Sequence, residues 1–556
     1  MKQRLIAIIL AVALLLSLCG CTAMTQRGLE LLQEMDEKAI AMDNQPQQSG
    51  ELPAYDELVY ERPDPDELWA AVDEVKAALD TGDADDVMDA LDAFYSLYWG
   101  YYGMYTIAII ESDADVEDDV MWEEYVYCTD ISWEIDEAVN AMLTACAASD
   151  LKEVLEKEYY GEGSLDGYSG EYTLDPVLQD LYLHESDLVE EYLQLHGQMS
   201  QHSGGDDFYE LYATDAAELF IELIQVRNSQ AMVLGYDSYA EMMYSDICFD
   251  YTPEQLMTYF EELQQYMVPV YRQQIQNGAY ENIRLTSISP EEAFDCTTQF
   301  LMDRDVAGIS TMLEKLVTGG YYNVEASGVK RDTTYAIYID SVDMPFLFLS
   351  PEGDTADCLS IAHELGHCDD MHLNYDTTYS TDISETLSQG MEYLYLCQED
   401  APYRDELLRY KLLESLDSDL YTAALSVFEH RAYALPEEEL TPERLHQLYA
   451  EVSADFGMYD TETVSDESWI YVDHVFQYPF YLSSYSVSDT AAFHFYLMEL
   501  EDPQSGENAY MDLQWNAPDY AFVEVLTMSG VPSPFEEGQV AAQARTIAQT
   551  LHELEE

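Results

Sequence analysis

The run His363-Glu364-Leu365-Gly366-His367 carries two histidines at the spacing that lets one helix bind a metal ion. Residues at positions i and i+4 of a helix project from the same side, with Cβ atoms about 6 Å apart. The two imidazoles can therefore converge on one zinc ion at about 2.0–2.1 Å. Glu364 follows the first histidine directly, so its carboxylate lies beside the ion and can accept a proton from a water molecule. The motif predicts metal-assisted hydrolysis, with His363 and His367 as ligands and Glu364 as the general base.

A catalytic zinc ion needs a third protein ligand, and Glu385 is the best-placed carboxylate for that role. The stretch between His367 and Glu385 is long enough for one helix to end, a loop to turn and a second helix to bring a carboxylate back. The fourth position then stays open for water. Glu392 lies two helical turns after Glu385 on the same face, so it either supports that ligand or competes with it.

Other polar residues lie close to the motif in sequence. Asp369, Asp370 and His372 either hydrogen-bond to the ligands or occupy solvated positions on the helix surface. Cys358 and Cys368 flank the motif but fall off the face of the two histidines by helical angle, so we expect both to be packing residues.

The elements that must position these residues can be read from hydrophobic periodicity. From residue 65 to about residue 315, apolar residues recur at helical spacing, beginning with Leu68, Val72, Val75 and Leu79, and the pattern is broken at Thr81-Gly82-Asp83. Such stripes predict a mainly α protein.

One stretch before the motif has the period of strands instead. Apolar residues alternate over 335–339, and Pro345-Phe346-Leu347-Phe348-Leu349 follows, which predicts a short strand pair. Gly353-Asp354-Thr355 then opens the metal helix, with Asp354 or Thr355 as its N-cap.

The N-terminus has the pattern of a bacterial lipoprotein signal. Lys2 and Arg4 precede an apolar stretch over 5–18, too short for a comfortable membrane span, and Leu18-Cys19-Gly20-Cys21 resembles a lipobox. We expect residues 1–20 to be removed and Cys21 to be lipidated, which implies an exported protein anchored to the outer face of the bacterial cytoplasmic membrane. An ordinary secretory cleavage with an accidental cysteine is the alternative.

The remaining chain divides by composition. Residues 21–63 are polar and contain Asn44-Gln45-Pro46-Gln47-Gln48-Ser49-Gly50, so they are predicted to be a tether. We expect an N-terminal helical domain over 64–200 and a catalytic domain over 201–556. Beyond the signal segment the cysteines are odd in number and form no CxxC pair, which predicts free thiols rather than a disulfide framework.

The charge balance is extreme. The 556 residues include 21 Lys and Arg against 111 Asp and Glu, a formal net charge of -90, while 48% of the residues are apolar. No basic surface is available for a phosphate backbone, so nucleic-acid binding is excluded, and any membrane attachment depends on the lipid at Cys21. The acids either form a solvated surface or steer cationic peptides toward a cleft.

Several runs together resemble the zinc oligopeptidases related to oligoendopeptidase F and thimet oligopeptidase. The approach to the motif over 353–362 is similar to that family, as are Glu385-Thr386-Leu387-Ser388 with Glu392, Val226-Arg227-Asn228 with 234–239, and Ser533-Pro534-Phe535-Glu536-Glu537-Gly538. The resemblance covers about residues 200–540. It implies a helical zincin-type oligopeptidase with a deep channel, a small β-sheet beside the metal helix, and Glu385 as the third zinc ligand.

The resemblance also implies roles for His474, Tyr481 and Tyr485, because the family places a histidine and tyrosines here to hydrogen-bond the substrate and the oxyanion. Tyr478 can replace either tyrosine, and a plain aromatic core is the alternative. Two departures stand out: the loop between the metal helices is shorter than is usual, and Ser483 stands where relatives often have tyrosine.

The sequence therefore predicts a monomeric zinc endopeptidase that holds one Zn²⁺ per chain and cleaves internal bonds of oligopeptides. The strand at 335–340 is expected to align the substrate backbone by strand addition. Two alternatives remain open: a lipoprotein that captures peptides without cleaving them, and a metallo-carboxypeptidase on a related scaffold.

Overall fold

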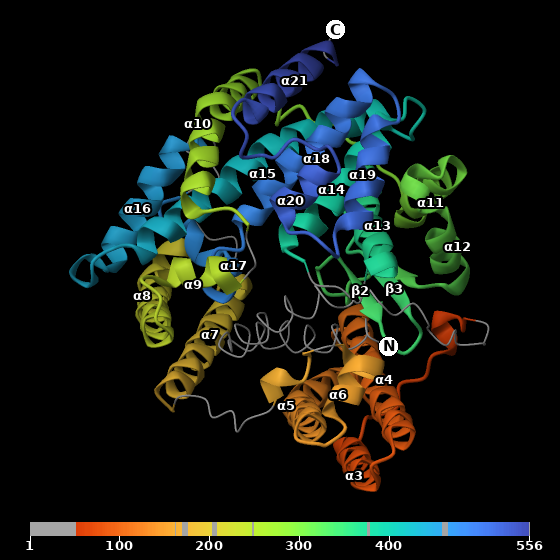
Figure 1. The fold of residues 1–556 in the computed structure, drawn as a ribbon. Coiled ribbons are helices and arrows are strands. Elements are labelled where there is room, and N and C mark those ends of the chain that lie inside the picture. Colours follow the sequence, from red (N-terminus) through yellow and green to blue (C-terminus); the bar gives the residue numbers. More distant parts are fainter. Residues whose placement is uncertain are drawn as a thin grey trace. The chain divides into compact units, whose positions relative to one another are not determined.

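The computed structural model describes residues 52–161, 163–168, 176–202, 208–246, 250–374, 379–458 and 465–554. These residues are mostly helical with one small sheet (Figure 1), which confirms the predicted mainly α fold. The predicted signal peptide, the lipidation site at Cys21 and most of the tether lie outside the described residues. Within the described ranges, no helix combines the length and the apolar character that crossing a membrane requires.

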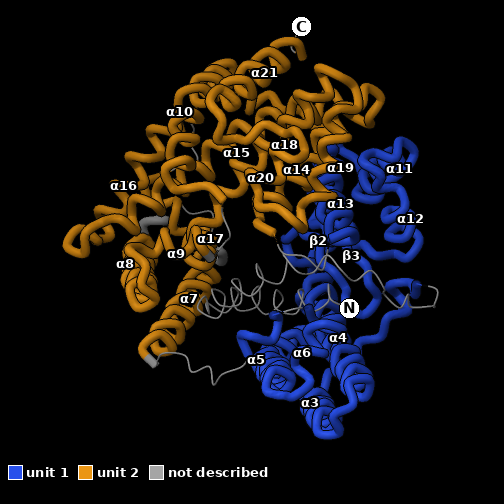
Figure 2. Tube along the Cα trace, in the orientation of Figure 1, with its two compact units in different colours: residues 1–12, 27–173, 286–378 blue, residues 13–26, 174–285, 379–556 orange. Residues whose placement is uncertain are grey.

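The described residues form two compact units, and neither is continuous in sequence (Figure 2). Unit 1 holds the described residues up to 173 and those of 286–378, whereas unit 2 holds those of 174–285 and from 379 onward. The domain boundaries expected from composition stay predictions.

Unit 1 begins with three helices that pack on one another. Leu68, Val72 and Val75 are buried, as the predicted apolar stripe requires. Gly82 ends the first helix in the left-handed conformation at φ 73°, and the Asp83 side chain then caps the next helix by accepting a hydrogen bond from the Asp85 amide. The helices of unit 1 are α3 (Pro65–Thr81), α4 (Ala84–Ala114), α5 (Asp119–Ala147), α6 (Lys152–Leu155), α11 (Pro290–Arg304), α12 (Ser310–Gly319) and α13 (Ala356–Asn374).

The sheet of unit 1 consists of β1 (Tyr322–Asn323), β2 (Tyr335–Ile339) and β3 (Met344–Phe348) in the order β1-β3-β2. β2 and β3 are antiparallel, with Tyr335 opposite Phe348, so the predicted strand pair is confirmed. β1 adds two residues in parallel to β3 and is too short to leave a periodic signal in the sequence. β2 and β3 pack against α13, which places the sheet beside the predicted metal helix (Figure 1).

Unit 2 is built around α15, which packs against α10, α16 and α18, while α14 lies along α18. Short-range signals in the sequence mark where these helices begin. At the start of α10, Thr252 and Gln255 form a capping box, and Pro253 occupies the first helical position. The helices are α7 (Pro176–His202), α8 (Phe208–Leu234), α9 (Tyr239–Asp246), α10 (Pro253–Gln276), α14 (Thr381–Cys397), α15 (Arg404–Tyr433), α16 (Pro442–Asp455), α17 (Asp473–Gln477), α18 (Ser483–Glu501), α19 (Ser505–Asn516), α20 (Phe522–Met528) and α21 (Gln539–Glu553).

The six described cysteines are free thiols, and Cys248 lies outside the described residues. Four of the six are buried: Cys128, Cys146, Cys358 and Cys368. Cys358 and Cys368 are fully buried on α13, as expected for packing residues.

Candidate metal centre and active site

The helix α13 starts where the sequence predicts its cap. Asp354 Oδ1 accepts a hydrogen bond of 2.9 Å from the backbone amide of Ala356, the first residue of the helix. The Asp357 carboxylate accepts two more, from the amides of Glu352 at 2.8 Å and Gly353 at 3.0 Å, and so fixes the turn that leads into α13. The N-terminal end of the metal helix is thus held by two aspartates.

The two histidines of the motif meet the predicted third ligand. The ring centroids of His363 and His367 are 4.9 Å apart, and one ligand atom from each of His363, His367 and Glu385 lies within 4.8 Å of the other two. The histidines are half-buried and the glutamate is buried. Burial, and then the neighbouring His363, lower the pKa of His367 well below its ordinary value, so its imidazole is neutral at neutral pH and able to bind a metal ion.

The other polar residues of α13 are more buried than a surface helix would have them. Glu364, the predicted general base, is buried. Asp369 and Asp370 are also buried, so the solvated alternative is wrong for both, because the sheet, α11 and α12 cover parts of this helix. His372 is half-buried, with Nε2 at 3.4 Å from Lys315 Nζ.

The helix α14 carries Glu385 and separates it from Glu392. The hydroxyl of Ser388 donates to Glu385 Oε2 at 3.2 Å, a contact one helical turn along that fixes the carboxylate. Glu392 Oε2 instead lies 3.0 Å from Lys411 Nζ, and both side chains are buried. Since the charge of Glu392 is taken up by this ion pair with α15, Glu385 is the carboxylate of α14 that joins the two histidines.

The second group of predicted site residues also comes together in unit 2. The ring of His474 lies 5.7 Å from Tyr481 and 6.3 Å from Tyr485, and these two tyrosine rings are 5.5 Å apart. Tyr478 joins them at 5.6 Å from His474. We call these four residues, His474, Tyr478, Tyr481 and Tyr485, the ring cluster.

Burial divides the aromatic run into two sets. All four members of the ring cluster are half-buried, while Phe476 and Phe480, between them in sequence, are fully buried. The structure thus places the two phenylalanines in the core, while the role of the ring cluster stays a prediction. Burial, and then Tyr485 and Glu385, raise the pKa of Tyr481 above its ordinary value. Its hydroxyl stays protonated and can donate a hydrogen bond, and the influence of Glu385 shows that this tyrosine lies near the predicted ligand.

Two contacts were not predicted from the sequence: Ser388 on Glu385, and Asp473 on His474. His474 Nδ1 lies 2.8 Å from Asp473 Oδ1, and this hydrogen bond lowers the pKa of Asp473. Because a carboxylate can only accept, the hydrogen is on Nδ1, which leaves Nε2 as the atom that can bond a peptide. The adjacency of Asp473 and His474 in sequence was the available signal.

The predicted substrate strand lies at an edge of its sheet, as strand addition requires. The Thr106 hydroxyl of α4 already donates to the carbonyl of Tyr338 at 3.3 Å, and α4 packs against β2. Part of this edge is therefore covered, and strand addition stays a prediction for the rest.

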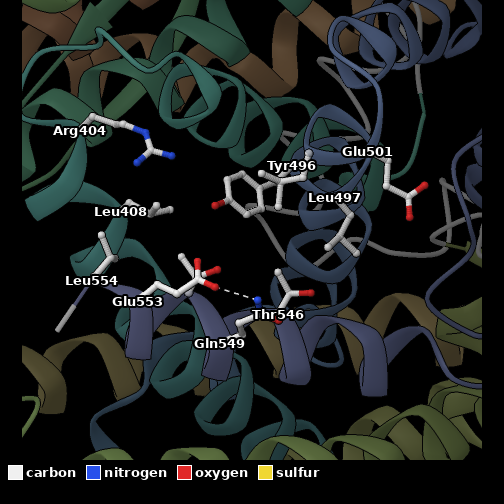
Figure 3. Close-up of a pocket in the computed structure, with 11 residues that line it drawn as sticks. Arg404, Leu408, Tyr496, Leu497, Glu501, Thr546, Gln549, Glu553 and Leu554 are labelled. Atoms are coloured by element: carbon white, nitrogen blue, oxygen red, sulfur yellow. Dashed lines mark hydrogen bonds between the residues drawn. The ribbon is translucent and has the colours of Figure 1, made fainter. Parts of the chain in front are cut away.

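A separate pocket of about 420 Å³ opens among α15, α18 and α21 (Figure 3). Arg404, Tyr496 and Glu501 line it with several leucines, and Gln549 donates to Glu553 at 2.8 Å on its wall. None of its lining residues is a predicted site residue.

Comparison with known proteins gives one family match and a set of similar folds. Residues 55–162 match the Peptidase M3 N-terminal domain, while no curated protein matches the chain. The fold is similar to that of PZ peptidase A, with a TM-score of 0.69 and 18% identity, covering 90% of this chain and 99% of the other. A second structure, assigned as an oligoendopeptidase F, has a TM-score of 0.69 and 20% identity, covering 90% of this chain and 99% of the other. A third structure, from Bacillus anthracis str. Ames and also assigned as an oligoendopeptidase F, has a TM-score of 0.68 and 18% identity. It covers 91% of this chain and 99% of the other.

Residues 55–162 thus match a domain of the M3 peptidases, and the fold of the described residues is similar to that of structures assigned as oligoendopeptidase F. The sequence resemblance, which covered residues 200–540, is thereby confirmed from a region outside that range. These findings support an oligopeptidase-type M3 peptidase, and the structure adds the His-His-Glu cluster on α13 and α14.

Proposed function

We propose that this M3 peptidase is a zinc-dependent endopeptidase that hydrolyses internal bonds of short peptides. The observation that carries the proposal is the cluster of His363, His367 and Glu385, whose ligand atoms lie within 4.8 Å of one another. Two imidazole nitrogens and one carboxylate oxygen form the donor set of catalytic zinc sites, which keep a fourth position for water. The cluster therefore fits one zinc ion per chain. When bound there, zinc supplies a Lewis acid for the scissile carbonyl group.

The chain's own residues supply proton transfer and charge stabilisation. Glu364 takes a proton from the attacking water and passes it to the leaving amine. The hydroxyls of Tyr481 and Tyr485 donate hydrogen bonds to the oxyanion, and His474 bonds the substrate. Tyr478 is the alternative donor, since it belongs to the same ring cluster.

We also propose that the protein is exported and anchored by lipid to the outer face of the bacterial cytoplasmic membrane. The support is the N-terminal pattern of Lys2, Arg4, the apolar stretch 5–18 and Cys21. Cells grown with labelled palmitate are expected to label the wild type. A Cys21→Ser variant that still carries the label would contradict lipidation at this residue.

The proposed partners are oligopeptides alone, with the chain acting as a monomer. The 111 acidic residues against 21 basic ones attract cationic peptides and leave no surface for nucleic acid. The kcat/KM for peptides rich in Lys and Arg should fall as salt rises from about 20 to about 300 mM, because ions screen the field. Neutral peptides of the same length are the control, and an equal response of both sets would contradict steering.

The decisive experiment is mass spectrometry of a mixed peptide pool after incubation with the zinc-loaded protein. Internal cuts in short peptides, lost in a Glu364→Gln variant of unchanged zinc content, are the expected result. Removal of single C-terminal residues would instead indicate a carboxypeptidase. A folded, zinc-loaded wild type that binds peptides and cuts none would contradict the proposal and favour peptide capture.

A further inference from the structure

The segment that carries His474 and Tyr481 has little regular structure of its own. α17 spans only Asp473–Gln477, and Phe480 has a left-handed backbone at φ 67°. A non-glycine residue in that conformation is strained and persists only where the surroundings hold it. Something outside the segment must therefore fix its backbone.

Two buried ionisable side chains from distant helices contact that backbone. Arg227 of α8 donates through Nη2 to the carbonyl of Phe476 at 2.6 Å. Glu429 of α15 accepts a hydrogen bond from the amide of Phe480 at 3.2 Å. The exposed fraction is 1% for Arg227 and 0% for Glu429, so water does not compete for either contact. The two contacts hold the segment on both sides of Tyr478.

Arg227 is itself fixed by two further hydrogen bonds. Its Nε donates to Glu185 Oε1 of α7 at 2.6 Å, and its Nη1 donates to the Tyr433 hydroxyl at the end of α15 at 2.8 Å. The second oxygen of Glu185 accepts from Gln230 Nε2 at 2.7 Å. A planar guanidinium can reach three acceptors on three elements at once, which the point charge of a lysine cannot do.

The buried positive charge of Arg227 is compensated by a neighbouring carboxylate, and the second nearby carboxyl group is mainly neutral. Glu185 neutralises the guanidinium, with both side chains almost fully buried. Burial raises the pKa of Glu429 to about 8, against the opposing effects of the Phe480 amide and of Arg227. At neutral pH Glu429 is thus mainly protonated, and its carbonyl oxygen can still accept from the amide of Phe480.

Aromatic packing closes the same region. The ring of Phe476 stacks on Tyr192 of α7 with centroids 3.7 Å apart, and the Tyr192 hydroxyl donates to the carbonyl of Ile470 at 3.1 Å. Tyr433, which bonds Arg227, stacks on Tyr239 at 5.4 Å. The segment is therefore buried on its phenylalanine side, which turns the ring cluster to the other side.

We propose that Arg227, Glu185 and Glu429 are positioning residues, which clamp the backbone at Phe476 and Phe480 and thereby hold the ring cluster in its catalytic arrangement. This inference rests on the proposed function, because the ring cluster is the proposed oxyanion site. None of the three residues touches the substrate. Their effect passes through the backbone that carries His474 and Tyr481.

The test replaces Arg227 by lysine, which keeps the charge and loses the planar fork. We expect kcat to fall about 10- to 100-fold, with KM within about threefold and one zinc per chain, because the ring cluster acts mainly on the transition state. Arg272→Lys is the matched control: Arg272 also donates to a backbone carbonyl, that of Ala454, but it is exposed. It should leave kcat unchanged.

A second pair of variants separates positioning from folding. Glu429→Leu removes the acceptor for the Phe480 amide, whereas Glu429→Gln keeps one. We expect kcat to fall in the leucine variant and to be largely restored in the glutamine variant. Hydrogen exchange should show faster exchange at residues 474–482 in Arg227→Lys and Glu429→Leu, with exchange in α14 unchanged.

The outcomes distinguish this inference from the proposed function. A wild type that cleaves no peptide contradicts the function. An active wild type whose Arg227→Lys variant keeps full kcat, or exchanges no faster at residues 474–482, overturns the clamp. If Arg227→Lys does not fold, the Glu429 pair decides by the same two criteria.

Discussion

His363 and His367 stand on one face of α13, where the helix itself sets their spacing, whereas His474 and Tyr481 lie in a segment with one short helix. Around the motif, in the interior of α13, the backbone groups are bonded within the helix, so the two imidazoles meet wherever the helix forms. In the segment, backbone atoms of Phe476 and Phe480 are bonded instead by side chains from α8 and α15.

The two regions therefore differ in the substitutions that they tolerate. A regular helix keeps its side-chain geometry as long as it stays folded, so substitutions away from the motif have little effect on the metal ligands. An irregular segment held by tertiary hydrogen bonds moves when any of its distant partners is changed. We therefore expect metal binding to depend on the motif residues themselves, and transition-state stabilisation to depend also on residues far from it.

The largest effect is expected for the helix-placed ligands. His367→Ala removes one of three ligands and should abolish both zinc binding and peptide cleavage, since metal sites with two ligands bind far more weakly. His372→Ala, on the same helix but outside the cluster, is the control and should keep one zinc per chain. Elemental analysis and peptide assays measure both. Zinc retained in full by His367→Ala would exclude it as a ligand.

Next in size is the effect of losing a hydroxyl from the ring cluster. Tyr481→Phe and Tyr485→Phe each remove one donor, and loss of an oxyanion donor costs about 10²- to 10³-fold in kcat. KM and zinc content should stay unchanged. The kcat of Tyr478→Phe in the same assay shows how much the third tyrosine contributes. If all three variants keep full kcat, the ring cluster does not stabilise the oxyanion.

Sequence periodicity was sufficient where local structure decides the geometry. The motif, the cap at Asp354 and the strand pair all follow from patterns within a few residues, because helix and strand periods are properties of the backbone. The prediction of Glu385 as the third ligand required only that a second helix follow the motif. The fold class followed from the same patterns and from the family resemblance.

Periodicity was insufficient where the partner is a backbone atom far along the chain. Arg227 bonds a carbonyl 249 residues away, and Glu429 bonds an amide 51 residues away. Every residue except proline has such an amide, and every residue has such a carbonyl, so the acceptor or donor leaves no mark on the sequence. The arginine was visible in Val226-Arg227-Asn228. Its role was not.

A third prediction concerns the stability of the clamp as pH changes. The pKa of Glu429 is about 8 in the folded protein, against about 4.3 when unfolded. Between these values the folded state holds a proton that the unfolded state has released. This group therefore makes stability fall as pH rises, by up to about 1.4 kcal/mol per pH unit. Glu429→Gln removes this titrating group, so the Tm of the variant relative to that of the wild type should rise from pH 5 to pH 8.

Scanning calorimetry at several pH values measures this gain. Glu438→Gln, an exposed glutamate after α15, is the control and should follow the wild type. A constant Tm difference between Glu429→Gln and the wild type would show that Glu429 is ionised throughout this range.

The smallest effect is expected at Gly390 of α14, the helix of unit 2 that carries Glu385. A Cβ there would lie 2.8 Å from Phe495 Cε2 of α18 and 3.1 Å from Tyr510 Cδ2 of α19, both in buried rings that cannot move away. Gly390→Ala should cost about 1–3 kcal/mol through overpacking. It shifts α14, which carries Glu385, against α18, which carries Tyr485, so kcat should fall by less than about tenfold.

Gly197 of α7 supplies the opposite case, because a Cβ there meets nothing within 4 Å on an exposed helix surface. Gly197→Ala should therefore stabilise by up to about 1 kcal/mol through helix propensity, with kcat unchanged. Thermal unfolding and peptide assays on both variants test the pair. If Gly390→Ala also stabilises, α14 and α18 have room between them, and the helix-placed ligand and the clamped segment respond to substitution independently.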